Sequence, residues 1–435
     1  MTEPKEIYRT LDFALRVGEM LLSNGAGAPD VEATMRSITH HLGLRSAVVD
    51  VTFITLTLSY QPVVDEPAII QTRHVTQRGI DYEDLTAVDH LVTNLLLGAL
   101  TLEQARSRLA RIASTGHSTP RWAISLSWGF IGAGVATLLG GDWIVVLIAF
   151  VASTLVEIIQ RFLAKRRFPF FYQQVAGGLL ATLIAVGVAA TDIPVDPSLV
   201  VTASIVMLLA GLGFIGAVQD AITGFYITAG ARLLEVMVAT AGIIVGVSGG
   251  LAVANSLGVD IALDPGASTW SHLPLMALGA AVAASAFAFS AYAPARVLLP
   301  IAVIGGLAAA LYFFIDMQGL GRAWAAATAS IAIGVVSFTV ARWVRVPPLV
   351  IIVSAIVPLL PGLSIYRALS LMSDGDSTGI LALVTAAAVA ISLASGVLLG
   401  EYLAQPIRHE ARRLEQRLAG PRLVGPRRLK TKRKP

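Results

Sequence analysis

The sequence contains no cysteine, and only 14% of its residues are charged. Disulfides, thiolate metal sites and cysteine nucleophiles are therefore excluded. Hydrophobic residues make up 55% of the chain, which is too large a share for a single soluble core with so few charges. The composition predicts a polytopic α-helical membrane protein whose apolar surface faces lipid.

Three kinds of signal are also missing. Residues 1–16 alternate acidic, basic and apolar side chains without a continuous apolar core, so they are not a secretory signal and the N-terminus is expected in the cytoplasm. No P-loop is present, which argues against a primary pump driven by a nucleotide bound to this chain. No HExxH motif or nucleophile elbow occurs, so we expect no metal, no other cofactor and no catalytic residue.

Residues 1–118 contain no apolar run long enough to cross a bilayer, and we expect them to form a small α+β cytoplasmic domain. The β-branched stretch 47–60 predicts a strand, with residues 68–76 as its partner. Apolar periodicity and helix-end signals predict four helices, near residues 7–22, 29–42, 84–100 and 102–114.

After Pro120, ten apolar runs have about the length needed to cross roughly 30 Å of hydrocarbon. We therefore predict two membrane halves of five helices, at residues 119–256 and 270–405, followed by a basic cytoplasmic tail at 406–435. The ten runs lie near residues 122–139, 143–162, 171–190, 199–218, 231–254, 273–290, 295–315, 323–341, 347–371 and 379–403.

Basic residues are distributed unevenly among the connecting loops. With the N-terminus inside, nine basic residues of the membrane-spanning part fall on the cytoplasmic side, and only Arg322 and Arg367 fall outside. Positively charged loops tend to stay in the cytoplasm, so this sorting favours ten spans with both termini cytoplasmic. The Arg- and Lys-rich tail directly follows a membrane helix, and there it is expected to meet anionic lipid headgroups rather than nucleic acid.

The fourth and ninth runs resemble each other weakly, since LAGLG at residues 209–213 is echoed by LPGLS at residues 360–364. This similarity divides the ten spans into five and five. An odd number of spans per half inverts the second half relative to the first, and such inverted repeats are a design of secondary transporters.

Both of these runs contain helix-breaking residues, and paired breaks indicate a central binding site where free N–H groups attract a carboxylate and free carbonyls accept an ammonium group. Proline kinks or close glycine packing between helices are the alternative. Arg367 would clamp a substrate carboxylate, or would instead contact lipid headgroups. The candidate substrate-binding residues are Gly211, Gly213, Pro361, Gly362, Ser364, Tyr366 and Arg367.

Charged side chains inside apolar spans are costly and usually face a cavity or a partner. Glu235, Glu157 and Asp220 are the candidate proton-coupling residues, and Glu235 is placed first. Glu157 and Glu235 lie toward the cytoplasmic ends of their spans. The alternative to a role in proton coupling is that their side chains simply extend to the membrane–water interface. Asp220 would line an inner vestibule or cap a helix end, and Gln173 and Gln174 would line a cavity or lie at the interface.

Several segments resemble the threonine/serine exporter family of bacterial membrane proteins. They are ALRVGEMLLSNGA at residues 14–26, VEATM at 31–35, VDVTFIT at 49–55 and PLLPG at 358–362. The resemblance covers nearly the whole chain. It departs at Ala210-Gly211, where the family has a Pro-Gly pair in the first half.

The resemblance implies a cytoplasmic N-terminal domain followed by ten helices in the bacterial inner membrane. It implies export of L-threonine and L-serine by proton antiport, with dicarboxylate (succinate-like) export as an alternative because some relatives have that association. The resemblance does not fix the oligomeric state, and a homo-oligomer is one possibility.

A membrane-anchored enzyme or receptor is the alternative from another class, because such N-terminal domains have been viewed as hydrolases. The spacing of the available side chains matches no catalytic motif, so we do not expect an enzyme. Those side chains are Ser23, His40, His41, Asp50, His74, Asp89 and His90.

Overall fold

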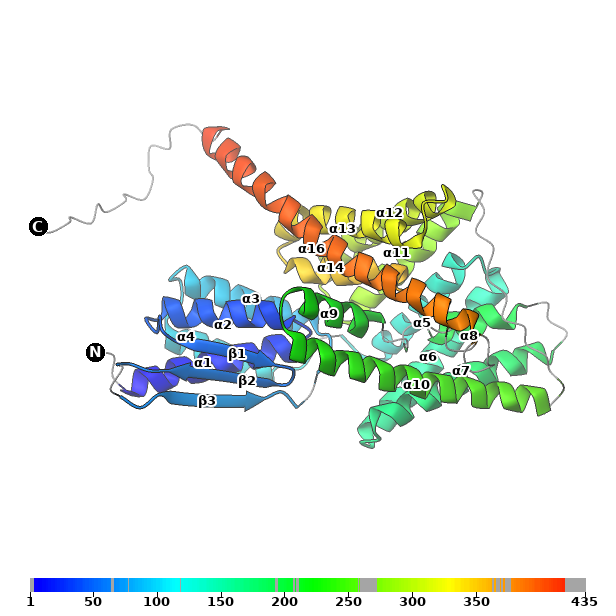
Figure 1. Ribbon diagram of the computed structural model, residues 1–435, viewed down its shortest axis with the longest axis horizontal. Coiled ribbons are helices and arrows are strands. Elements are labelled where there is room, and N and C mark those ends of the chain that lie inside the picture. Colours follow the sequence, from blue (N-terminus) through cyan, green and yellow to red (C-terminus); the bar gives the residue numbers. More distant parts are fainter. Residues whose placement is uncertain are drawn as a thin grey trace, which may run out of the picture.

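The computed structural model describes residues 4–63, 66–76, 78–117, 119–191, 195–205, 208, 211–256, 258, 272–361, 364, 368, 371 and 377–418, with side chains of the last segment described to residue 404. The chain is elongated, with a mixed helical and sheet part at one end and long helices filling the rest (Figure 1). The far end of α16 extends on the same side as the mixed part.

The mixed part, called the N-terminal unit below, contains four helices and three strands within its described residues. The predicted helix near 84–100 starts slightly earlier, because the Asp81 carboxylate accepts hydrogen bonds from the backbone N–H groups of Glu83 and Asp84. The elements are α1 Pro4–Ser23, α2 Ala28–His41, β1 Val48–Thr52, β2 Thr55–Tyr60, β3 Ile69–His74, α3 Tyr82–Leu96 and α4 Leu102–Ser114.

The prediction of one strand over residues 47–60 is wrong in one respect, because this stretch forms the hairpin β1–β2. The chain reverses at Phe53, whose φ of 53° lies in the left-handed region. A bulky residue rarely adopts this conformation, and the continuous β-branched run gave no turn signal. The strands form an antiparallel sheet in the order β1-β2-β3, so residues 69–74 do pair with the second half of the predicted strand.

Seven of the ten predicted apolar runs after Pro120 coincide with long helices. In the described part of the chain, seven helices are long and apolar enough to cross a membrane. They are α6 Trp143–Lys165, α7 Phe170–Ala189, α10 Tyr226–Ser256, α11 Leu273–Ser290, α12 Ala295–Met317, α13 Arg322–Val344 and the first part of α16 Thr378–Leu418.

The other three predicted runs look different. The first is α5, Arg121–Leu138. The fourth is divided into α8, Pro197–Ile205, and α9, Gly211–Ile222. The ninth contains α14, Pro348–Ile356, continued by the short 3-10 helix η2, Val357–Leu359. The two runs predicted to be interrupted are therefore the two whose described helices are short.

Apolar side chains cover the outside of the long helices, as expected for helices in contact with lipid. On α6 the exposed residues recur along one face, while the opposite face buries small side chains such as Ala149 and Ala152. Four exposed tryptophans lie near helix ends, where aromatic rings are favoured at the membrane interface; they are Trp122, Trp143, Trp324 and Trp343.

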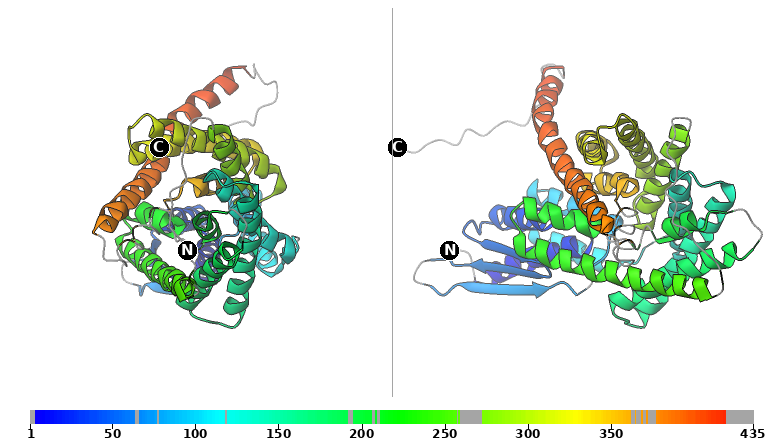
Figure 2. Two further views of the ribbon diagram at one scale, coloured as in Figure 1. Left: turned by 90° about the vertical axis from the view of Figure 1, so that its right-hand side faces the viewer. Right: turned by 45° about the vertical axis from the view of Figure 1, so that its right-hand side comes forward.

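The two sets of five segments have matching neighbours. In the first set, α5 packs on α6, α7 packs on α10, and α8 contacts α5, α6 and α7. In the second set, α11 packs on α12, α13 packs on α16, and α14 contacts α11, α12 and α13. The sets meet along α5 and α11 (Figure 2).

Glycines bring several of these helices into direct backbone contact. Gly134 of α5 lies against Gly279 of α11, and a Cβ at Gly134 would be 2.7 Å from the Gly279 carbonyl oxygen. At Gly246 of α10, a Cβ would be 2.2 Å from the Val175 carbonyl oxygen of α7. Backbone atoms cannot move aside as a flexible side chain can, so these positions require glycine.

Replacing Gly246 by alanine is expected to destabilise the folded protein by about 1–3 kcal/mol, because α7 and α10 must separate to admit the methyl group. The matched control is Gly249→Ala in the same helix, where the nearest atom is a side-chain carbon 3.9 Å away. Thermal unfolding of the purified variants in detergent measures the difference. Equal melting temperatures for the two variants would contradict this packing.

Candidate functional site

The fourth run is interrupted between Ile205, the last residue of α8, and Gly211, the first residue of α9. The Asp196 carboxylate caps the start of α8 by accepting a hydrogen bond of 2.9 Å from the Ser198 backbone N–H. Near the break, the buried Ser204 hydroxyl donates back to the Val200 carbonyl oxygen at 2.6 Å. At the end of α8, the Ile205 carbonyl oxygen accepts a hydrogen bond of 2.9 Å from the Leu208 backbone N–H.

The ninth run has a corresponding change of backbone after Ile356. Proline cannot continue an α-helix, and the chain tightens into η2 around Pro358 before Leu360 becomes extended, with ψ of 134°. The buried Ser354 hydroxyl donates to the Val350 carbonyl oxygen at 2.7 Å, as Ser204 does in α8.

The two interruptions are in contact. A Cβ built on Gly211 would lie 3.2 Å from the Leu360 Cβ. The predicted substrate residue Pro361 directly follows Leu360 in the chain and is buried. The segments are separated by about 150 residues in the chain, yet they meet within the membrane part of the molecule.

The remaining predicted substrate residues are less well gathered. Gly213 faces α10, where a Cβ would be 3.0 Å from the Val236 side chain. Ser364 is partly buried. Gly362, Tyr366 and Arg367 lie outside the residues that the structure describes.

A polar cluster between α6 and α7 lies beside the fourth-run break. The Gln160 amide donates to the buried Gln174 side chain at 3.4 Å, and both Gln160 and Leu208 lie close to Gly177. Gln173 instead is partly exposed and donates to the Phe168 carbonyl oxygen, as expected at the membrane interface. From the sequence, each glutamine could either line a cavity or lie at the interface. The structure places Gln174 in the interior and Gln173 nearer the surface.

Glu157 belongs to the same face of α6, one turn before Gln160. It is only 7% exposed, and its Oε1 lies 3.6 Å from the Arg161 guanidinium. Its Oε2 is buried and has no hydrogen-bond partner among the described residues. Charged side chains in such a setting usually face a cavity or a partner, so the geometry keeps Glu157 among the candidates for proton coupling.

Asp220 and Glu235 form ion pairs of two kinds. Asp220 of α9 is 1% exposed, and its Oδ2 lies 2.9 Å from the Arg232 guanidinium of α10. Glu235 lies nearer the surface, with a half-exposed side chain 2.8 Å from Arg78 of the N-terminal unit. The first pair ties α9 to α10 inside the protein, and the second joins α10 to the N-terminal unit.

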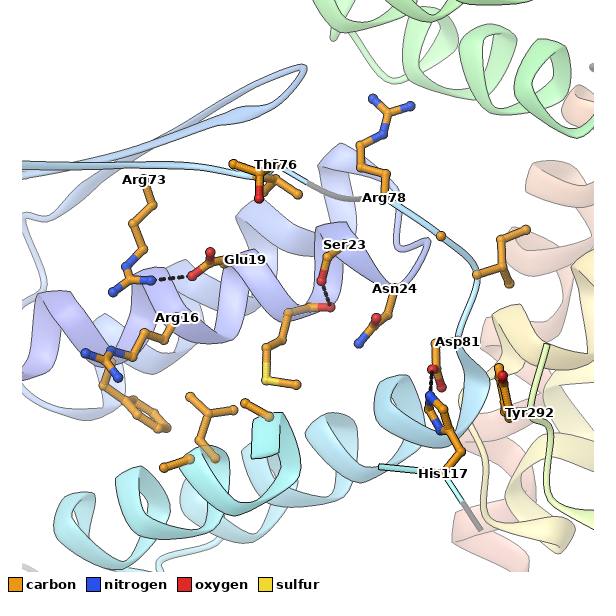
Figure 3. Close-up of a pocket in the computed structure, with 18 of the residues that line it drawn as sticks. Arg16, Glu19, Ser23, Asn24, Arg73, Thr76, Arg78, Asp81, His117 and Tyr292 are labelled. Carbon is orange, nitrogen blue, oxygen red and sulfur yellow. Dashed lines mark hydrogen bonds and ion pairs between the residues drawn. The ribbon is translucent and has the colours of Figure 1, made fainter. Parts of the chain in front are cut away.

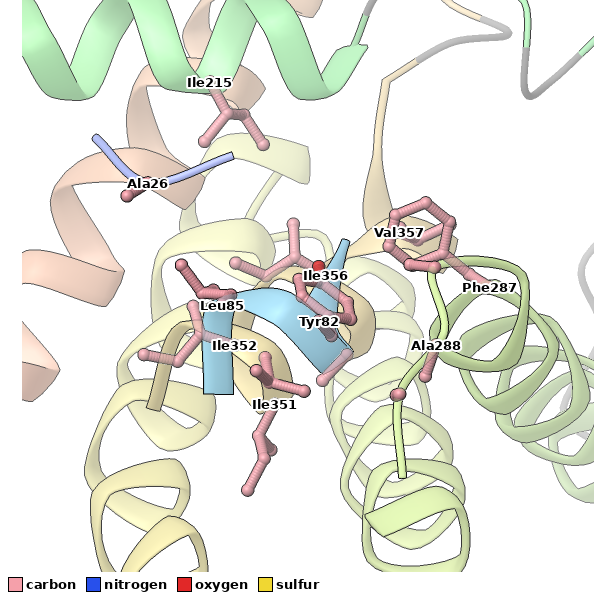
Figure 4. Close-up of a cluster of buried hydrophobic side chains, with 14 of the residues drawn as sticks. Ala26, Tyr82, Leu85, Ile215, Phe287, Ala288, Ile351, Ile352, Ile356 and Val357 are labelled. Carbon is pink, nitrogen blue, oxygen red and sulfur yellow. The ribbon is translucent and has the colours of Figure 1, made fainter. Parts of the chain in front are cut away.

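The N-terminal unit inserts an apolar cluster between the two interrupted runs (Figure 4). Tyr82, at the start of α3, is fully buried, and its ring meets Phe287 of α11 edge-on at 6.4 Å. Ile215 of α9 and Ile356 of α14 belong to the same cluster. The backbone N–H of Tyr82 also donates to the Ala291 carbonyl oxygen at 2.8 Å. One docking surface thus contacts both halves of the membrane part.

Sequence reasoning missed the residues that make this docking surface, including Tyr82 and Arg78. Their partners are far away in the chain, since Arg78 and Glu235 are 157 positions apart. No local pattern marks such pairs. One sequence does not show which distant residue contacts a tyrosine at the start of a helix. Covariation between positions of related sequences could have revealed such a contact.

The side chains considered for a hydrolase do not assemble. His74 bonds to Thr55 across the sheet, and His90 bonds to the Arg345 carbonyl oxygen at the docking surface. Ser23 donates to the Met20 carbonyl oxygen within α1. In the part of the chain that the structure describes, no hydrogen bond joins any two of these candidates.

Burial, together with the neighbouring Asp81, raises the pKa of the Asp84 carboxyl to about 6. A raised pKa in the folded state makes an acid stabilising below its unfolded pKa and destabilising above its folded pKa. We therefore expect stability to fall as the pH rises from about 4 to about 6. Asp84→Asn should flatten this part of the melting temperature profile, whereas Asp50→Asn on the exposed face of β1 should leave it unchanged. A profile that keeps its slope in Asp84→Asn would contradict the assignment.

Comparisons with known proteins identify the family. A family model described as "Putative threonine/serine exporter" matches residues 12–254, more than half of the chain. A second, described as "Threonine/Serine exporter, ThrE", matches residues 276–403. The chain belongs to the threonine/serine exporter family. The first match ends within α10 and the second begins within α11, so the two family models divide the protein between these helices.

Individual relatives agree with this assignment. The "Probable threonine/serine exporter" of Mycobacterium tuberculosis is 35% identical over 95% of this chain and 80% of its own length. The "Threonine/serine exporter" of Corynebacterium glutamicum is 33% identical over 95% of this chain and 86% of its own length. The "Probable succinate transporter subunit YjjP" of Escherichia coli is 26% identical over half of this chain. No solved structure gives a significant match.

Proposed function

We propose that this protein exports L-threonine and L-serine from the cytoplasm by secondary transport, through a site between the interrupted fourth and ninth runs. The contact of Gly211 with Leu360 carries this proposal, because it brings the start of α9 against the end of the interrupted ninth run within the membrane part. The relatives named as threonine/serine exporters supply the substrate class.

The proposed architecture has ten membrane segments in two inverted halves. The matching neighbours of the two sets of helices support it, as does the similarity between PSLVVTASI in α8 and PLVIIVSAI in α14. In the ten-segment arrangement these two helices start from opposite membrane faces. An exchange of conformations between the halves would then open the central site to alternate sides.

We place the N-terminal unit in the cytoplasm of a bacterial cell and the helices in its inner membrane. Basic residues gather at the helix ends that face the N-terminal unit, among them Arg121, Arg296 and Arg342. Loops rich in Arg and Lys are retained on the cytoplasmic side. The basic tail is proposed to follow the same rule and to meet anionic lipid.

The interrupted helices offer both charges that a zwitterionic amino acid requires. The start of α9 presents N–H groups and the positive end of a helix dipole, which suit the carboxylate. The end of α8 presents carbonyl oxygens, which suit the ammonium group. The hydroxyl groups of Ser204 and Ser354 donate to carbonyl oxygens of their own helices close to the two breaks, and their rotation would direct them toward the hydroxyl of a bound substrate.

Proton coupling is proposed to use Glu157. Its burial and its unpartnered oxygen distinguish it from Glu235, whose carboxylate already has a short ion pair at the surface. Glu157 also lies beside the polar cluster that reaches the fourth-run break. Protonation there would change the charge next to the substrate site.

The function is tested by release of labelled L-threonine from proteoliposomes, with and without an imposed proton gradient. We expect gradient-dependent release that added L-serine inhibits and succinate does not. Inhibition by succinate alone would shift the substrate to dicarboxylates. Absence of threonine and serine flux from folded protein would overturn the proposal.

Neutralising the proton carrier should separate coupling from transport. Glu157→Gln is expected to reduce gradient-stimulated release at least tenfold while leaving threonine-for-threonine exchange within about twofold of the original. The control is Glu235→Gln, which removes a half-exposed ion pair worth about 1 kcal/mol or less and should keep gradient dependence. The reverse outcome would assign coupling to Glu235.

A further inference from the structure

A cavity of about 920 Å³ opens in the N-terminal unit. It lies between α1, the segment around β3, and α4 (Figure 3). Arg121 at the start of α5 and Tyr292 in the α11–α12 connection close its membrane end. The cavity is therefore separate from the proposed transport site but touches helices of both membrane halves.

Arginine side chains dominate the charged lining. Arg16, Arg73 and Arg106 all bond to one carboxylate, that of Asp12, at 3.1, 3.5 and 3.3 Å. Their guanidinium groups must therefore converge within a few ångströms of one another. Glu19 pairs with Arg73 as a second acid. Three positive and two negative charges leave the cluster with one positive charge unbalanced.

Arg121 adds a second unbalanced charge. It lines the cavity and has no ion-pair partner among the described residues. Arg78 and His117 also line the cavity and already have acidic partners, since Arg78 pairs with Glu235 and His117 lies 2.9 Å from Asp81. The excess charge thus lies with Arg121 and the cluster around Asp12.

The converging guanidinium groups have unused hydrogen-bonding capacity. Arg16, Arg73 and Arg106 make four side-chain hydrogen bonds to Asp12 and Glu19, and each guanidinium has more N–H donors than these bonds use. A single carboxylate is satisfied by one arginine fork, whereas a phosphate group has more acceptor oxygens and a charge close to −2. Three convergent arginines therefore match phosphate better than carboxylate.

The rest of the cavity is suited to the body of a small molecule. Met20, Leu109 and Ala113 form an apolar wall, and the His117 ring stacks on Tyr292 with ring centroids 3.8 Å apart. The volume is much larger than a single inorganic ion needs. We propose that this cavity binds a small phosphorylated metabolite, with the phosphate held by Arg16, Arg73 and Arg106.

Binding is tested on the purified full-length protein in detergent, and the test requires no transport. Inorganic pyrophosphate is titrated by calorimetry in magnesium-free buffer, and succinate is titrated in parallel as the carboxylate probe. We expect pyrophosphate to bind at least tenfold more tightly than succinate. Arg73→Gln and Arg106→Gln should each weaken binding at least tenfold, because each removes one convergent guanidinium.

The matched control is Arg108→Gln, which removes an exposed arginine of the same helix α4 that does not line the cavity. It should change the affinity less than twofold. Thermal melts of the unliganded variants establish that each is folded. Absence of pyrophosphate binding, or equal weakening by Arg108→Gln and Arg106→Gln, would overturn the proposal. Tighter binding of succinate would overturn the assignment to phosphate.

Discussion

Replacing Asp220 by asparagine is expected to destabilise the protein by about 3–5 kcal/mol and to abolish export, because the change leaves Arg232 buried without its counter-charge. The Asp220 side chain is 1% exposed and that of Arg232 is 15% exposed, so water cannot replace the lost partner. The backbone N–H of Ala28 also interacts with Asp220, so the loss extends to the N-terminal unit. Denaturant unfolding and threonine release measure the two effects.

A double replacement separates the cost of an unpaired charge from the role of the ion pair. Asp220→Leu combined with Arg232→Met removes both charges, and buried ion pairs replaced by apolar residues often keep their stability. The double variant should therefore be more stable than Asp220→Asn. If Asp220→Asn alone were as stable as the original protein, the ion pair would not hold α9 on α10.

Replacing Gly211 by valine is expected to reduce threonine export at least tenfold while the protein still folds. The new side chain would enter the space occupied by Leu360, whose Cβ would be 3.2 Å from a Cβ at position 211. That contact joins the two interrupted runs, so the effect should fall on transport. Proteoliposome release of labelled threonine, with thermal melts for folding, measures it.

A second substitution tests whether the contact itself is responsible. Leu360→Ala removes the side chain that valine would meet, so combining it with Gly211→Val should recover a substantial part of the lost rate. Gly187→Val is the control, since nothing lies within 4 Å of a Cβ at that position of α7. Failure of Leu360→Ala to restore any rate would argue against direct contact of the breaks.

The helices could be predicted from the sequence because lipid imposes a length on them. Runs such as 143–162 and 295–315 end within a few residues of α6 and α12. The hairpin at Phe53 could not be predicted, because its turn uses neither glycine, proline nor asparagine. Its geometry is supported from outside the strand, by a hydrogen bond of 3.0 Å from the Phe53 N–H to the Thr228 hydroxyl.

The interruptions could also be anticipated, because proline and glycine disrupt helices through their own backbone chemistry. Local chemistry marked Gly211 and Pro361 but could not say that the two segments touch. The burial and the ion-pair partners of the acidic residues were still less predictable. Glu157 and Glu235 look alike in sequence, and only the fold makes one buried and the other a surface partner of Arg78.

The absence of native cysteine allows the central claim to be tested with a single thiol. Leu360→Cys would place it at the contact between the interrupted runs, and its alkylation rate would be measured in proteoliposomes with and without L-threonine. We expect L-threonine to slow alkylation several-fold, L-lysine to have no effect, and a control thiol from Ser46→Cys on the exposed N-terminal unit to react at a constant rate. An export-competent Leu360→Cys protein whose alkylation is unaffected by L-threonine would place the transport site elsewhere.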